Sequence, residues 1–347
     1  MWLLFCVLLV PLLTGSVVMI LLSIWLVARV GRRDVDPSLP QYPDVSVLVP
    51  HFNEDPRLLL QSLDALDAQV YPGTLRIFVV DDGSTNGVQT AISPWFSVAR
   101  RREFRPVVFA QNNGSKGKAI DATLPHLPSE TDVLVVLDSD THVESDGILR
   151  LVERLWRDDD CAAVCGFIVP ANQDDSFLTR LQYFEHIGIY PAVKSAQDRI
   201  GRVSVMAGAF VAHRMSVVRK IGGFGRWIVE DIAWTWAALA AGHSTGYAPD
   251  AVAYTHCPTS FGGLLRQRRR WARGRVEAFR AAFEISKWRT LRLAPLFLLW
   301  ILSLSPPTLC LMPVLAVFFG QWWVFAVMAA SSLLYLSIFQ LYPSQIP

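Results

Sequence analysis

The chain has 347 residues, of which 52% are hydrophobic and 18% are charged, and its mean hydropathy is positive. This composition excludes an ordinary soluble domain along the whole length, because the apolar excess lies at the two ends. The formal net charge is only +2, so charge says little about partners, and we expect no nucleic-acid partner.

Both ends of the chain predict membrane-spanning helices. Residues 2–28 carry no charged side chain over a length that crosses a bilayer. Since no basic residue precedes this run and no small-residue cleavage site stands out, we expect a retained anchor rather than a cleaved signal peptide. Residues 293–347 contain no Lys, Arg, Asp or Glu and have room for two further spans, with a kink expected at Pro306-Pro307.

Basic residues lie on the inner side of each apolar end, within residues 29–33 and 287–292. The positive-inside rule therefore places the residues between the ends in the cytoplasm, in a multi-pass protein of the inner or plasma membrane. The predicted parts are an N-terminal transmembrane helix (1–28), a linker (29–43), an α/β domain (44–259), an amphipathic interfacial helix (260–292) and two transmembrane helices (293–347).

Between the ends, strands and helices alternate. Apolar residues 45–50 and 75–80 predict two strands joined by a helix over 55–69, and residues 133–136 predict another buried strand. A third strand is expected over 106–110. A β-α-β unit with a short crossover has parallel strands and a right-handed connection, so these strands should end at one edge of a sheet.

Carboxylates follow two of these strands. Asp81 and Asp82 come after the second strand, and Asp138 and Asp140 come after residues 133–136. In open α/β sheets, ligands bind outside the carboxyl ends of the strands. Two carboxylates one residue apart suit a hard divalent cation such as Mg²⁺ or Mn²⁺ that would hold nucleotide phosphates. An acidic turn that caps the next helix would have the same sequence.

A glycine-rich basic loop, residues 112–118, follows the third predicted strand and opens a helix. Its backbone N–H groups and Lys118 are placed to meet phosphate, although a solvated helix start would also look like this. No G-x-G-x-x-G follows the first strand, and the Walker lysine pattern is absent. These tips therefore favour a nucleotide-sugar site over a dinucleotide site or a P-loop.

Two further segments offer groups for chemistry. Gly208, within a predicted strand over 204–212, would let a substrate approach the backbone. Glu230 and Asp231 directly precede a helix predicted over 232–241. Asp231 is either the N-cap of that helix or a general base near an acceptor hydroxyl, which the helix N-terminus would keep ionised. Residues 177–195 are expected to form one amphipathic helix.

Residues 261–283 predict a long amphipathic helix, with apolar side chains on one arc and arginines on the adjoining one. Such a helix is typical of the cytoplasmic face of a membrane. Gln267 and Trp271 are four residues apart and share a side, with Arg270 next to it. Plain membrane attachment would require no chemistry from them.

With these motifs in view, the chain resembles the processive family-2 glycosyltransferases, which include the bacterial poly-N-acetylglucosamine, hyaluronan, chitin-oligosaccharide and cellulose synthases. The resemblance covers about residues 44–285 and rests on D-D-G-S, G-K-A, D-S-D, E-D and Q-R-R-R-W in this order. It implies a Rossmann-like GT-A fold. It also implies donor-side roles: Asp81 and Asp82 on the uridine, Lys118 near the donor, and Asp138 and Asp140 on UDP and the metal.

The resemblance also implies roles on the acceptor side. Asp231, beside Glu230, would deprotonate the acceptor hydroxyl. The residues that would line the acceptor and the diphosphate are Gln267, Arg270, Trp271 and Gly208. A metal ion would neutralise the leaving diphosphate as a Lewis acid, and a single displacement would invert an α-linked donor to a β-linkage.

The expected protein is a membrane-embedded, inverting, UDP-sugar-dependent hexosyltransferase that extends a β-linked polysaccharide. Its partners would be the donor, the growing glycan and membrane lipids, with accessory subunits as a further possibility. Fewer spans are visible than processive relatives typically carry, so we expect either a short variant or an incomplete sequence. A one-shot transferase with a lipid acceptor, of the ceramide glucosyltransferase kind, shares the Q-x-x-R-W pattern and stays open. A non-catalytic scaffold is disfavoured because the acidic residues and Trp271 are all present.

Overall fold

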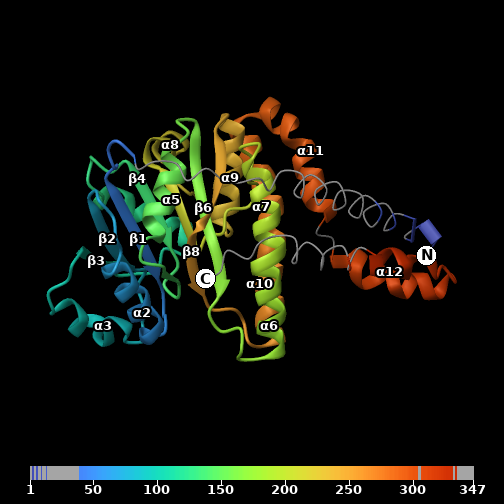
Figure 1. Cartoon of the computed structure of the whole chain (residues 1–347), viewed down its shortest axis with the longest axis horizontal. Helices are drawn as coiled ribbons and strands as arrows, with labels where there is room; N and C mark the ends of the chain where they lie inside the picture. Colours follow the sequence, from blue (N-terminus) through green and yellow to red (C-terminus); the bar gives the residue numbers. More distant parts are fainter. Residues whose placement is uncertain are drawn as a thin grey trace.

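The computed structural model describes residues 39–303 and 306–330, with residues 2, 3, 5, 6, 9, 13 and 333. At its centre is one eight-stranded sheet with helices on both faces, and a long helix runs beside it (Figure 1). An α/β domain of this kind is what the alternating strands and helices predict.

The sheet is parallel on one side and mixed on the other. Its strands, in spatial order, are β3 (Glu103–Val108), β2 (Leu75–Asp81), β1 (Val45–His51), β4 (Val133–Leu137), β7 (Phe210–Arg214), β6 (Cys161–Pro170), β8 (Ser244–Thr255) and β5 (His142–Val143). β1 pairs in parallel with β2 and β4, and β2 with β3, which confirms the expected β-α-β connection. β7 runs antiparallel to both β4 and β6.

Helices cover both faces of this sheet. One face carries α2 (Pro56–Asp67), α3 (Val88–Phe96) and α5 (Gly147–Trp156), and the other carries α4 (Lys116–Thr123), the short η1 (Leu124–His126), α8 (Met215–Ile221) and α9 (Glu230–Ala241). Val47 belongs to the core on the first face, whereas its neighbour Leu48 belongs to the core on the second. Because both faces are buried, β1 and β4 have continuous apolar sequences.

Three predicted elements differ from the structure. β3 lies a few residues before the expected strand over 106–110. The strand expected over 204–212 begins only at Phe210, because the preceding backbone bonds to side chains: Ser204 N donates to Gln197 Oε1, and Gly208 N donates to Asp231. The helix expected over 177–195 is divided, as the next paragraph describes.

The divided helix consists of α6 (Phe177–Phe184), a π-helical segment η2 (Glu185–Ile189) and α7 (Tyr190–Asp198). Pro191 has no N–H to donate to the preceding turn, so a regular α-helical ladder cannot continue through it. A single π turn absorbs this change of register, and such turns are common near functional sites.

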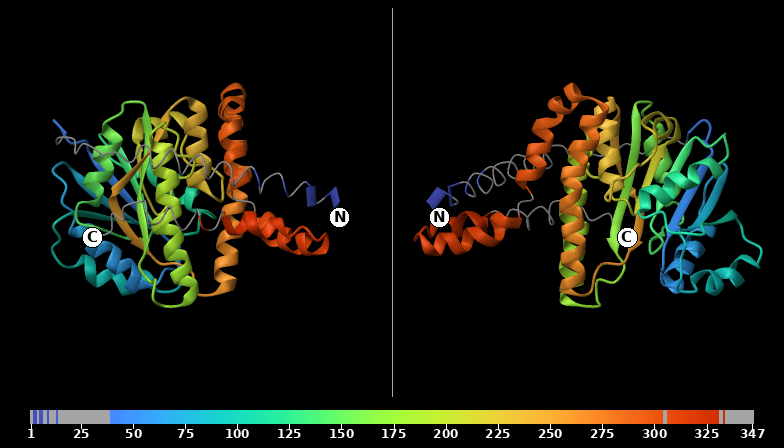
Figure 2. Two further views of the ribbon diagram at one scale, coloured as in Figure 1. Left: turned by 45° about the vertical axis from the view of Figure 1, so that its right-hand side comes forward. Right: turned by 180° about the vertical axis from the view of Figure 1, so that it is seen from behind.

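Three helices follow the sheet. α10 (Phe261–Ile285) lies along α9, where Ala278 and Ala282 pack with Trp236 and Leu239. α11 (Lys287–Ser303) and α12 (Pro306–Phe318) come next, and α12 extends away from the α/β domain beyond α10 (Figure 2). The ring of Trp2 lies 4.8 Å from that of Phe319, so the described N-terminal residues contact the segment directly after α12.

The predicted membrane spans are not supported by the described part of the chain. None of its helices is both long enough and apolar enough to cross a bilayer, since α11 has 17 residues and α12 has 13. Pro306 and Pro307 form the first turn of α12, where proline is tolerated. Most of residues 1–28 and 331–347 lie outside the described residues.

Candidate active site

The acidic tips meet at the carboxyl ends of the parallel strands. In the sheet, His51 at the end of β1 is opposite Asp81 at the end of β2, and β4 pairs with the other side of β1. Asp81 Oδ1 accepts a hydrogen bond of 2.8 Å from Ser84 N. Asp82 Oδ1 accepts one of 3.0 Å from Asn113 N, which ties the second tip to the glycine-rich loop. The expectation of a shared edge is therefore confirmed.

Lys116 places a positive charge among the carboxylates. Its Nζ pairs with Asp138 Oδ1, donates to Gly208 O at 2.9 Å and lies 3.7 Å from Glu230 Oε1. Lys118, the lysine that the sequence predicts near the donor, is exposed one half-turn further along α4, and its N–H is capped by Ser115 Oγ at 3.3 Å. Its role stays a prediction.

Close packing explains why Lys116 turns inward. A Cβ on Gly117 would lie 2.9 Å from Glu230 Cβ and 3.1 Å from Gly225 O, so only glycine lets the first turn of α4 approach the first turn of α9 this closely. Nothing local in the sequence distinguishes the two lysines. Lys116 is selected by its proximity to Glu230, which is far away in the sequence and therefore leaves no local pattern.

Asp138 and Asp140 are crowded by negative charge. Burial, the charge of Asp138 and the charge of Glu54 together raise the pKa of Asp140 to about 6. Its Oδ1 accepts a hydrogen bond of 3.3 Å from Thr255 Oγ1. Glu54, which the sequence did not single out, accepts a 2.7 Å bond from Ser139 Oγ. Even so, no three His, Cys, Asp or Glu side chains of the described residues converge closely enough to form a metal site of protein ligands alone.

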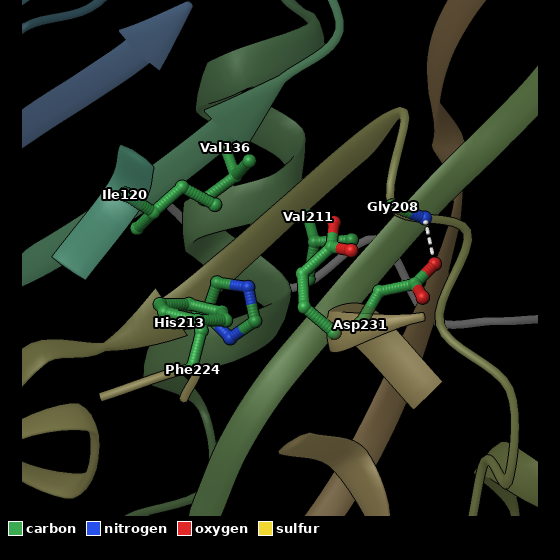
Figure 3. Close-up of a pocket in the computed structure, with 8 residues that line it drawn as sticks. Ile120, Val136, Gly208, Val211, His213, Phe224 and Asp231 are labelled. Carbon is green, nitrogen blue, oxygen red and sulfur yellow. Dashed lines mark hydrogen bonds between the residues drawn. The ribbon is translucent and has the colours of Figure 1, made fainter. Parts of the chain in front are cut away.

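Asp231 is held by two backbone N–H groups. Its Oδ2 accepts a hydrogen bond of 2.8 Å from Gly208 N, which is drawn as a dashed line in Figure 3. Its Oδ1 accepts a hydrogen bond of 2.8 Å from Ile232 N. The structure corrects the N-cap interpretation: Val229 occupies that position, and Asp231 lies in the first turn of α9. A Cβ on Gly208 would lie 2.6 Å from Asp231 Oδ2, so a side chain there would displace the carboxylate.

Burial is the largest influence on the pKa values of Glu230 and Asp231. It raises the pKa of Glu230 to about 7 against the opposing charge of Lys116, and the charge of Asp231 raises it further. Burial also raises the pKa of Asp231, while Lys116 and the bonds from Ile232 and Gly208 act in the other direction. Carboxylates with pKa values raised in this way suit proton transfer near neutral pH.

A small pocket opens beside these carboxylates (Figure 3). Gly208, Glu230 and Asp231 form its polar side, and its other lining residues are Ile120, Val136, Val211, His213 and Phe224. Burial lowers the pKa of His213 to about 3, so this imidazole is neutral. No motif in the sequence singles out His213 as a residue of this pocket.

The residues predicted on the acceptor side lie on α10. Gln267 and Trp271 are partly exposed and Arg270 is exposed, and among the described residues none of them bonds to the carboxylates of the pocket. Trp271 is instead anchored by Arg268, whose guanidinium lies 4.4 Å from the ring centroid. Arg268 also donates to Tyr190 Oη at 2.6 Å and pairs with Glu185 in the π-helical segment.

These carboxylates and Lys116 gather at the carboxyl ends of the parallel strands, where open α/β sheets bind ligands. Residues 43–274 match the family described as Glycosyltransferase like family 2. The chain therefore belongs to this glycosyltransferase family, which confirms the expectation of a family-2 glycosyltransferase domain.

Relatives and solved structures extend the comparison. An N-acetylglucosaminyltransferase from Neorhizobium galegae is 36% identical over 257 residues, covering 70% of this chain and 56% of the relative. One from Rhizobium leguminosarum bv. viciae is 34% identical, covering 71% and 58%. The chain thus spans little more than half the length of these relatives.

The fold is similar to that of a mannosyltransferase from Pyrobaculum calidifontis solved with GDP-Man and Mn²⁺, with a TM-score of 0.64, 20% identity and coverage of 97% of both chains. S. aureus TarS (residues 1–349) in complex with UDP gives a TM-score of 0.53 at 16% identity, covering 76% of this chain and 72% of that one. These likenesses confirm the predicted GT-A-like fold.

Proposed function

We propose that the chain is an inverting transferase that moves N-acetylglucosamine from UDP-N-acetylglucosamine to a hydroxyl of an acceptor glycan. The observation that carries this proposal is the Asp231 carboxylate, held by Gly208 N and Ile232 N at the mouth of the pocket beside the Lys116–Asp138 pair. The choice of sugar is supported by the names of the relatives.

In this reaction Asp231 accepts the proton of the acceptor hydroxyl while its oxygen attacks the anomeric carbon and the bond to the diphosphate breaks. One displacement gives a β-linkage from an α-linked donor. Lys116, next to Asp138, favours negative charge at the donor side of the pocket. The glycine at position 208 keeps the backbone close to Asp231, because a Cβ there would lie 2.6 Å from Asp231 Oδ2.

Asp138 and Asp140 fit a divalent cation. Burial raises the pKa of Asp140, and the nearby charges of Asp138, which pairs with Lys116, and of Glu54 raise it further. A hard cation relieves this repulsion, and carboxylate oxygens are its preferred ligands. We propose that these two aspartates hold Mg²⁺ or Mn²⁺, which would supply charge neutralisation of the leaving diphosphate.

We also propose that the domain works at a membrane on its cytoplasmic side, anchored by the apolar residues 2–28 and 293–347. Support comes from α10, on which Phe261, Leu265 and Val276 are exposed beside the exposed arginines at 266, 269 and 273. Apolar and basic side chains together suit an anionic bilayer surface. We propose that repeated transfer extends a growing polysaccharide, which is the product. Accessory subunits are proposed as further partners.

The same exposed face of α10 favours one alternative, a single transfer to a lipid acceptor. To test both, the full chain in nanodiscs with Mn²⁺ would be offered UDP-N-acetylglucosamine, UDP-glucose, UDP-glucuronate, UDP-galactose and GDP-mannose in turn. We expect UDP release with the first donor and a ladder of oligomers. One glycolipid product that requires added lipid would support the alternative, and turnover with GDP-mannose only would overturn the proposal.

A further inference from the structure

A carboxylate outside the pocket bonds to the backbone that precedes the catalytic pair. Glu277 lies on α10 and is only 7% exposed. Its Oε2 accepts hydrogen bonds from Ile228 N at 2.9 Å and Val229 N at 3.0 Å. Its Oε1 accepts 2.9 Å from Arg273 Nε, one helical turn earlier. Both backbone donors lie directly before the first turn of α9.

The contact is reinforced by close packing. A Cβ on Gly274 would lie 2.9 Å from both Cβ and Cγ1 of Val229, so the backbone of α10 approaches this residue directly. Val229 O in turn accepts 3.1 Å from Ala233 N and starts the ladder of α9. α10 therefore contacts the start of α9 through a carboxylate and through its own backbone.

The same helix carries the residues assigned to the acceptor. Trp271 precedes Gly274 by three residues and Glu277 by six, so all three belong to two successive turns of one rigid element. A displacement of α10 caused by an acceptor is thus transmitted to the residues that precede Asp231. No other described side chain accepts a hydrogen bond from Ile228 N or Val229 N.

We propose that Glu277 is a positioning residue that sets the place of the Asp231 carboxylate according to the position of α10. This inference rests on the proposed function for its kinetic part only. Without the Glu277 carboxylate, the buried N–H of Val229 and the partly buried N–H of Ile228 lose their acceptor, which is costly. The segment before α9 would then relax and Asp231 would leave its place beside Gly208. A misplacement of about 1 Å at a reacting group lowers turnover by up to roughly 100-fold.

Three variants of the full chain separate positioning from general damage. Glu277→Ala removes the acceptor, and Glu277→Gln keeps an oxygen that accepts from both N–H groups. Glu284→Gln is the matched control, because Glu284 lies on the same helix but is exposed and, among the described residues, pairs with the side chain of Arg226 alone, at 2.7 Å.

Hydrogen–deuterium exchange of the peptide covering residues 226–232 tests the placement without any substrate. We expect about tenfold faster exchange in Glu277→Ala, and exchange close to wild type in Glu277→Gln and Glu284→Gln. Equal exchange in all four proteins would overturn the proposal, and it would do so even if the proposed sugar were wrong.

Steady-state kinetics with UDP-N-acetylglucosamine and chitotetraose test the consequence for catalysis. We expect Glu277→Ala to lower kcat by roughly 10- to 100-fold with the donor KM unchanged, and Glu277→Gln to restore most of kcat. A donor KM that rises as much as kcat falls, or a Gln variant as impaired as the Ala variant, would contradict positioning. Absence of wild-type turnover would refute the proposed donor and leave exchange to decide on Glu277.

Discussion

Replacing Lys116 with methionine removes the positive charge that faces the carboxylates of the pocket. In the folded chain, Lys116 Nζ pairs with Asp138, donates to Gly208 O and lies 3.7 Å from Glu230. The Lys116 side chain is 24% exposed and that of Glu230 is 9% exposed, so water replaces little of this interaction. The variant therefore leaves Glu230 buried without its nearest opposite charge.

The cost follows from this geometry. Removing one partner of a buried ion pair costs about 3 to 5 kcal/mol. Because the Asp138 side chain is 39% exposed and solvent screens it, we expect a loss of about 2 to 3 kcal/mol in the free energy of unfolding at pH 8. Lys118→Met, two residues away on an exposed site, is the control and should lose less than about 0.5 kcal/mol.

The loss in the free energy of unfolding caused by Lys116→Met should depend on pH. Glu230 has its pKa raised from 4.5 to about 7 by burial, so the folded state holds this proton more tightly than the unfolded state does. The stability that Glu230 contributes through this raised pKa is therefore complete below about pH 4.5, and it is lost as pH rises towards 7. Lys116 limits that loss by stabilising the ionised form. At pH 5, where Glu230 is protonated, Lys116→Met should cost less than at pH 8.

Urea denaturation of the three proteins, followed by tryptophan fluorescence in EDTA at pH 5 and pH 8, measures these differences. The reasoning is refuted if Lys118→Met is as destabilising as Lys116→Met. It is also refuted if the loss caused by Lys116→Met is larger at pH 5 than at pH 8.

Three other outcomes are expected. Gly208→Ala should lower kcat about 100-fold and the free energy of unfolding by about 1 to 3 kcal/mol, because the new Cβ would lie 2.6 Å from Asp231 Oδ2. In the control Gly262→Ala, the nearest atom to the new Cβ lies at 3.6 Å, so neither quantity should change. Equal effects of the two substitutions would contradict this prediction. Trp271→Ala should raise the acceptor KM roughly 10-fold with the donor KM constant, as stacking on a sugar requires; a change confined to the donor KM would exclude that role. Because the pKa of Asp140 is about 6, Mn²⁺ affinity in a calorimetric titration should fall about tenfold per pH unit below pH 6, and an affinity independent of pH from 5 to 7 would argue against Asp140 as a ligand.

Much of the donor side of the site follows from local patterns. Largely apolar runs predicted β1, β2 and β4, and a short crossover predicted the parallel pairing of β1 with β2. Strand direction alone then placed Asp81 and Asp138 at one edge of the sheet. These inferences hold because a buried parallel strand has a strong sequence signature that needs no knowledge of distant residues.

The remainder depends on contacts between segments far apart in the chain. Lys116 rather than Lys118 faces the pocket because Gly117 packs against Glu230. The expected strand over 204–212 is shortened because the backbone of Gly208 bonds to Asp231 instead of to a neighbouring strand. Tertiary contacts of this kind override local propensity, and neither of them leaves a periodic signal in the sequence.

For the helices after the sheet, too, the sequence pattern predicts one part and tertiary packing decides the rest. The amphipathic pattern predicted α10, which runs over Phe261–Ile285. Apart from Glu277, its buried residues are glycine and alanines that face α9, while Phe261 and Val276 are exposed. Hydrophobic periodicity indicates that a helix has a preferred side, but close helix packing selects small residues such as Ala278, which a hydrophobicity pattern does not rank highly.

The central claim is that Asp231 is the base of a transfer from UDP-N-acetylglucosamine, and Asp231→Asn tests it most directly. Asparagine keeps an oxygen that accepts from Gly208 N but cannot take up the acceptor proton at neutral pH. With Mn²⁺ and chitotetraose, the account predicts UDP-N-acetylglucosamine binding within a few-fold of wild type by calorimetry, and UDP release slowed by about 100- to 10,000-fold. UDP release by Asp231→Asn at the wild-type rate would contradict it.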